Sequence, residues 1–62
     1  MSYRFTPQFL ADVQRMPVAR LHAYRRVAAR LYDTNPVRYA AMDALMRAEI
    51  TSREAEKTRH AA

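Results

Sequence analysis

Apolar residues recur at helical spacing in three segments of the chain, and each segment begins at a proline. Thr6 is a favourable N-cap, and Pro7 suits the first position of a helix. Pro17 disfavours helical backbone in the residue before it, so the first helix should end there. The pattern therefore predicts a short N-terminal helix over residues 7–15, with three side chains facing the core: Phe9, Leu10 and Val13.

The second segment runs from about Pro17 to Tyr32 or Asp33. Four apolar positions follow a 3-4-3 spacing and form a stripe along the helix: Leu21, Tyr24, Ala28 and Leu31. Three more apolar residues widen this stripe: Val18, Val27 and Tyr32. A short turn follows, in which Asn35 is a good N-cap for a third helix that begins at Pro36. Because the connection is short, the second and third helices should be antiparallel neighbours.

The third segment continues to about Ile50, and its apolar residues cover more than half of the helix circumference. In a unit of this size the internal core can cover only one side of the helix, so the excess indicates contact with a second chain or a partner. The residues predicted for this third-helix face are Tyr39, Met42, Met46 and Ile50. Beyond Ile50 the apolar pattern stops, and the tail from about residue 52 is expected to fray.

These elements predict an all-α fold: an antiparallel helical hairpin with a short N-terminal helix, forming one small domain over residues 1–62. A chain of 62 residues buries only about 60% of its unfolded surface, so its stability alone is marginal. The sequence has no cysteine and two histidines, which excludes disulfides and makes a structural zinc site unfavourable. Self-association, or docking on a larger partner, is the remaining source of stability, and we expect a homodimer.

The net charge of +5 is concentrated in residues 18–32, which contain four arginines and no acidic residue. The side chains predicted to contact a partner form a basic ridge: His22, Arg25, Arg26 and Arg30. Such a ridge can be a solvated face, a phosphate-binding surface for nucleic acid or lipid headgroups, or a docking surface for an acidic protein. A helix-turn-helix motif fits poorly, because there the helix after the turn reads the DNA, whereas here the basic helix precedes it.

The composition excludes most enzyme classes. Without glycine, the chain cannot form a phosphate-cradling loop, a dinucleotide fingerprint or a nucleophile elbow. His22 is the one plausible general base, yet its helical neighbours are Arg25 and Arg26, and no acid is close enough in sequence to orient it. We therefore expect no catalytic residue, no metal ligand and no cofactor.

Charged residues interrupt every stretch long before about 20 apolar residues, so no transmembrane segment is expected. The absence of cysteine is compatible with a reducing compartment, and we expect a cytoplasmic location. The sequence predicts a non-enzymatic interaction protein, an adaptor, regulator or inhibitor, that binds a larger protein partner. The alternative is a basic accessory protein that contacts nucleic-acid phosphates through the basic ridge.

Overall fold

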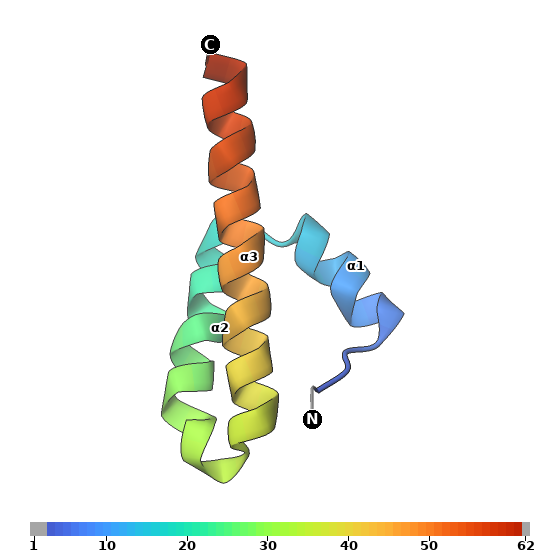
Figure 1. Cartoon of the computed structure of the whole chain (residues 1–62), viewed down its shortest axis with the longest axis vertical. Coiled ribbons are helices and arrows are strands. Elements are labelled where there is room, and N and C mark those ends of the chain that lie inside the picture. The colour runs from blue at the N-terminus through green and yellow to red at the C-terminus, as the bar shows by residue number, and fades with distance from the viewer. Residues whose placement is uncertain (1–2, 62) are drawn as a thin grey trace.

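The structure, a computed structural model, describes residues 3–61, and for residues 60 and 61 the backbone alone. It contains α1 (Pro7–Arg15), α2 (Val18–Leu31), a 3-10 turn η1 (Tyr32–Thr34) and α3 (Pro36–Ala61). No strand occurs within residues 3–61, so the expected all-α class is confirmed. Helices α2 and α3 lie side by side and run in opposite directions, while α1 lies across one side of the pair (Figure 1).

Side chains at the helix starts satisfy backbone N–H groups as the sequence predicts. The Thr6 hydroxyl accepts a hydrogen bond from the Phe9 amide at 3.1 Å. The Asn35 side-chain oxygen accepts one from the Arg38 amide at 3.2 Å. Met16 is extended, with φ −67° and ψ 141°, which ends α1 before Pro17. These local signals give helix starts that match the expected ones to within one residue.

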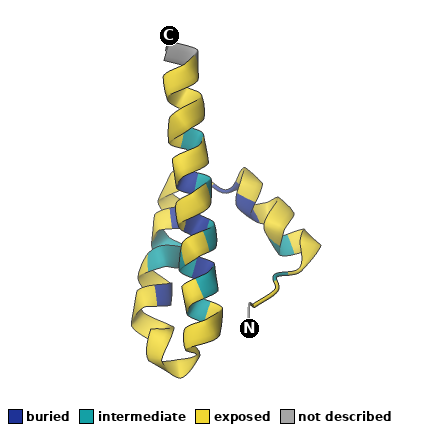
Figure 2. Ribbon diagram, in the orientation of Figure 1, coloured by how far each residue is buried: buried dark blue, intermediate teal, exposed yellow. Residues whose placement is uncertain are grey.

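Among the residues that the structure describes, seven are buried and make the core, and they lie along the line where α2, α3 and α1 meet (Figure 2). They are Val13, Met16, Leu21, Ala28, Met42, Met46 and Ile50. Half-buried aromatic residues extend it: Phe9 packs edge-to-face on Tyr24, with ring centroids 6.1 Å apart, and stacks on Phe5 at 5.2 Å. The core is small even for this chain length, because α2 contributes only two fully buried side chains.

Several residues that the spacing assigned to the core are exposed. Leu10 is 39% exposed, so its predicted inward position is wrong. Leu31, a member of the 3-4-3 stripe, is also exposed, and so are the flanking residues Val18, Val27 and Tyr32. The reason is geometric: α2 packs on α3 along a narrow line, and α1 packs mainly on α3, so neither covers the flanks of the stripe.

The predicted end of the third helix near Ile50 is wrong, because α3 continues to Ala61. Residues 54–59 are helical although their side chains are exposed (Figure 2). No glycine or proline interrupts this stretch, and the Thr58 hydroxyl donates to the Glu54 carbonyl at 3.0 Å. The apolar pattern therefore ends where packing ends, and the helix itself extends further. Fraying of the tail concerns its stability and stays a prediction.

Candidate functional site

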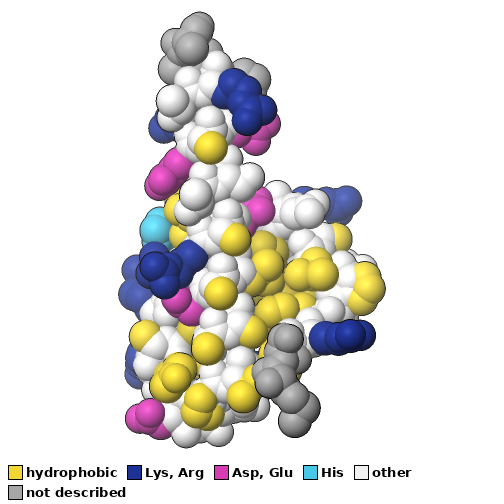
Figure 3. Space-filling view, viewed as in Figure 1, with side chains coloured by type: hydrophobic (Ala, Val, Ile, Leu, Met, Phe, Trp, Pro, Cys, Tyr) yellow, Lys and Arg dark blue, Asp and Glu magenta, His cyan; other side chains and the backbone are white. Residues whose placement is uncertain are grey.

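The exposed side of α2 carries three residues of the basic ridge. His22, Arg26 and Arg30 are exposed and stand four residues apart, so they share one face of the helix. Basic side chains gather along the α2 edge of the molecule (Figure 3). Among the residues that the structure describes, Arg26 and Arg30 have no carboxylate within ion-pair distance. Their charges are therefore available to a partner.

Arg25, the fourth residue of the basic ridge, has a different role. Its Nε lies 3.1 Å from the Asp43 carboxylate on α3, and its side chain is 38% exposed. Arg47 approaches the other oxygen of the same carboxylate at 3.6 Å. The assignment of Arg25 to a free partner-binding surface is corrected, because this arginine links α2 to α3. Sequence reasoning missed the link, since Arg25 and Asp43 are 18 positions apart.

The third-helix face is also corrected by the structure. Met42, Met46 and Ile50 are 7%, 0% and 8% exposed, and they form the core of the monomer. Tyr39 is half-buried at the edge of that core, with the Arg38 guanidinium 5.4 Å from its ring centroid. The broad apolar arc of α3 divides by size: its methionines and isoleucine point inward. Its exposed members are mainly alanines, including Ala40, Ala44 and Ala48, together with Val37 near its start.

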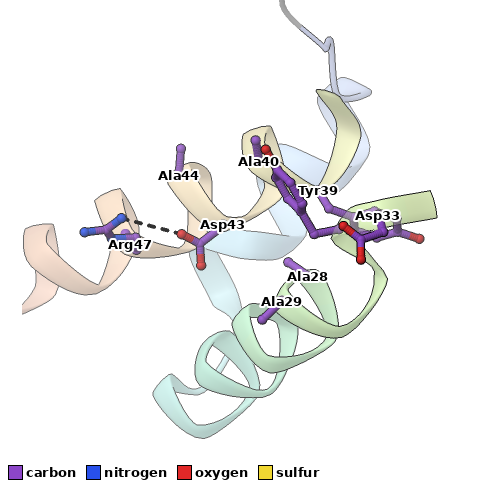
Figure 4. A pocket seen from close by; sticks show the side chains of 9 residues that line it. Ala28, Ala29, Asp33, Tyr39, Ala40, Asp43, Ala44 and Arg47 are labelled. Carbon is purple, nitrogen blue, oxygen red and sulfur yellow. Dashed lines mark ion pairs between the residues drawn. The ribbon is translucent and has the colours of Figure 1, made fainter. Parts of the chain in front are cut away.

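An open groove of about 530 Å³ lies between α2 and α3, and no residue of α1 lines it. We call it the α2–α3 groove. Four alanines from the two helices form its floor: Ala28, Ala29, Ala40 and Ala44. Tyr39 and Asp33 lie at one end, near the turn, and the Asp43–Arg47 ion pair lies at the other (Figure 4). Tyr32 completes the wall at the turn end.

The groove and the basic ridge adjoin each other. Arg26, Ala29 and Asp33 follow one another at spacings of three and four, so they lie on the same side of α2 and its continuation into η1. Arg30 lies further round α2, where it lines a separate hollow with Val27 and Leu31. The surface thus combines an alanine floor, two tyrosines and exposed arginines.

No polar or charged side chain is buried among the described residues, and His22 is exposed with no acidic partner beside it. Within the described part of the chain, no three His, Asp or Glu side chains lie together as metal ligands. In the same residues, no helix has the length and apolar character needed to cross a membrane.

No protein-family model, curated protein or solved structure matches this chain.

Proposed function

We propose that this protein is a small non-enzymatic interaction module, an adaptor, regulator or inhibitor, whose α2–α3 hairpin binds a larger protein partner. One observation carries the proposal: arginines and large apolar side chains alternate on the exposed C-terminal half of α2. Val27, Leu31 and Tyr32 are 43%, 39% and 48% exposed, and they are interleaved with Arg26 and Arg30. Val27, Arg30 and Leu31 together line a surface hollow.

This mixture fits a protein partner better than a polyanion. Phosphate binding uses positive charge and gains little from exposed valine or leucine, whereas protein interfaces bury apolar side chains. Arginine and tyrosine are also the residues that contribute most at interface centres. The partner surface should therefore be acidic and partly apolar.

Nucleic-acid binding is the second candidate, and the free charges of Arg26 and Arg30 favour it. Helix α2 carries no acidic residue from Val18 to Leu31, so nothing on it repels phosphates. Contacts of this kind go to the backbone and carry little sequence specificity.

Homodimerisation and a cytoplasmic location also belong to this proposal. A core of seven residues and an apolar side chain such as Val37, which is 52% exposed, support self-association. The absence of cysteine is compatible with a reducing compartment.

A capture experiment tests the function. The tagged protein is incubated with native cell extract, with and without nuclease, and bound proteins are identified. We expect a partner that survives nuclease treatment and is lost from the variant Arg26→Glu/Arg30→Glu. The charge-matched control, Arg15→Glu/Arg59→Glu, changes two exposed arginines outside the surface and should retain the partner.

The alternative predicts the opposite result. If nuclease removed every captured protein, and the wild type bound duplex DNA with an affinity that fell log-linearly with salt, the phosphate-binding function would replace the protein-binding one. The expected salt slope is about −0.9 for each phosphate contacted.

A further inference from the structure

We propose that the α2–α3 groove receives an amphipathic helix of the partner that carries acidic residues beside a stripe of small apolar ones. This inference rests on the proposed function and deepens it by naming the chemistry of the segment that is bound. It joins two observations, the alanine floor of the groove and the basic side chains along its edges.

The shape of the groove suits a helix. The four alanines of its lining present only methyl groups, so the backbone of a third helix can approach them closely. The residues that α3 contributes span Tyr39 to Arg47, which corresponds to about 12 Å, or two helical turns. A bound helix would therefore place two or three apolar residues on the floor, at i, i+3 or i+4, and i+7 spacing.

The charges around the groove select an acidic helix. Arg26 lies one turn before Ala29 on the same side of α2, and Arg47, with a side chain 65% exposed, lies on the α3 side. The Asp43 carboxylate has Arg25 and Arg47 as partners, at 3.1 and 3.6 Å. Glutamates on the flanks of a bound helix would meet the exposed side chains of Arg26 and Arg47.

Asp33 fixes the direction of the bound helix. It is the acidic residue at the turn end of the groove, opposite the Arg47 end (Figure 4). A helix N-terminus carries partial positive charge, and a helix C-terminus partial negative charge. The partner helix should therefore place its N-terminus near Asp33 and its acidic residues toward Arg47.

Other occupants fit less well. A second copy of this chain would bring another set of the same arginines to the groove, and like charges would then face each other. A nucleic acid would leave the alanine floor without a complementary surface. These occupants are separate outcomes of the test.

The first measurement uses synthetic helical peptides as probes. One peptide of about 18 residues, long enough to form a helix, carries alanine and leucine on one face and glutamates on the flanks. Its matched control carries lysines in place of the glutamates. Titration into the ¹⁵N-labelled protein should shift the amide signals of Ala29, Ala40 and Ala44 with the acidic peptide alone. Shifts located elsewhere, or equal binding of the lysine peptide, would overturn the proposal.

Variants of the protein test the groove directly. Ala44→Leu fills the floor and should weaken binding of the acidic peptide by about tenfold or more. The control Ala48→Leu adds the same side chain one turn further along α3, at an exposed position outside the groove lining, and should leave affinity unchanged. Equal loss in both variants would contradict the proposed site. A spin label on the peptide N-terminus should broaden the amide signals near Asp33, and broadening near Arg47 would contradict the direction.

The groove and the function can fail separately. If the captured partner bound the Ala44→Leu variant normally but was lost from Arg26→Glu/Arg30→Glu, the groove inference would be wrong and the protein-binding function would stand. If wild-type protein captured no nuclease-resistant partner, the function would fail, and the peptide titration would still report on the groove. If Ala44→Leu lowered the mass of an oligomer in sedimentation equilibrium, the occupant would be a second copy, against the proposal.

Discussion

Arg53 shows how much one side chain can contribute in a protein with so small a core. Its Nε donates to the Glu49 carboxylate at 3.0 Å, within α3. Its Nη2 donates to the carbonyl oxygens of Val13 and Gln14, at 3.1 and 3.2 Å. These two carbonyls belong to the last turn of α1, where positive charge is favourable, and the Val13 carbonyl also accepts from the Met16 amide at 3.2 Å. Arg53 therefore caps α1 and fastens it to α3 at once.

Arg53→Ala should lower the free energy of unfolding by about 1 to 2 kcal/mol, because it removes charge-assisted hydrogen bonds to the end of α1 and leaves the Val13 carbonyl with its bond from the Met16 amide. Urea denaturation measures the loss, and amide hydrogen exchange should speed up most in α1. Arg59→Ala removes an exposed arginine of the same helix and should have little effect. Equal stability of the two variants would show that the Arg53 contacts do not hold α1.

Met46 is fully buried at the centre of the core, between α2 and α3. Met46→Ala should cost about 2 to 5 kcal/mol, a large part of the stability of so small a domain. A charged residue there should unfold the monomer itself, rather than only weaken a dimer as the sequence had suggested. Ala48→Met, which adds a methionine at an exposed position, is the matched control and should melt within a few degrees of the wild type. A cooperative melt retained by Met46→Glu would contradict this role.

Contacts within one helix can be predicted from the sequence, whereas contacts between helices cannot. The pairs Asp43–Arg47 and Glu49–Arg53 follow from i,i+4 spacing, and both form in the structure. The Arg25–Asp43 pair and the contact from Arg53 to α1 depend on how helices pack, so spacing within one helix could not predict them. This is why Arg25 was assigned to the free surface.

At the scale of the helix, α3 shows that a segment can be helical without packing on the rest of the molecule. Prolines and N-cap residues located the helix starts correctly, because those signals act within a few residues. The predicted end of the third helix near Ile50 was too early, because it assumed that a helix stops where its apolar face stops. The segment from Glu54 to Arg59 has favourable helical residues, and no proline or glycine breaks it. Which face of α3 is the core was likewise ambiguous, since alanine suits both sides of a helix.

The exposed tail of α3 should be dispensable for folding. A chain that ends at Glu54 keeps Arg53 and all seven core residues, and it loses only residues whose described side chains are exposed. We expect its melting temperature to stay within a few degrees of the full chain, with a loss of helical circular dichroism proportional to the residues removed. A control ending at Glu49 loses Ile50 and Arg53 and should no longer melt cooperatively. If the Glu54 chain behaved like this control, the tail would be contributing to the packed fold.

At the scale of the molecule, the surface left uncovered is large compared with the core. Seven residues are buried, while large apolar side chains such as Val27, Leu31 and Val37 are 39–52% exposed. A chain of this size buries only about 60% of its unfolded surface, and without disulfides or a metal it gains most from association. The sequence could indicate this excess of apolar residues, but only the packing shows that Met42 and Met46 are inside while Val37 and Ala44 are outside.

Self-association is therefore expected through surfaces outside the core. Sedimentation equilibrium at micromolar concentration should give a mass near that of two chains, and the melting temperature should rise with protein concentration, because dissociation accompanies unfolding. Val37→Glu places a charge at the most exposed of the large apolar residues and should lower the dimer fraction while leaving monomer helicity intact. Lys57→Glu, which changes charge at an exposed position in the tail, is the control. A monomeric mass with concentration-independent melting would show that the uncovered apolar surface serves the partner alone, and it would leave the groove and the exposed C-terminal half of α2 as the binding surface.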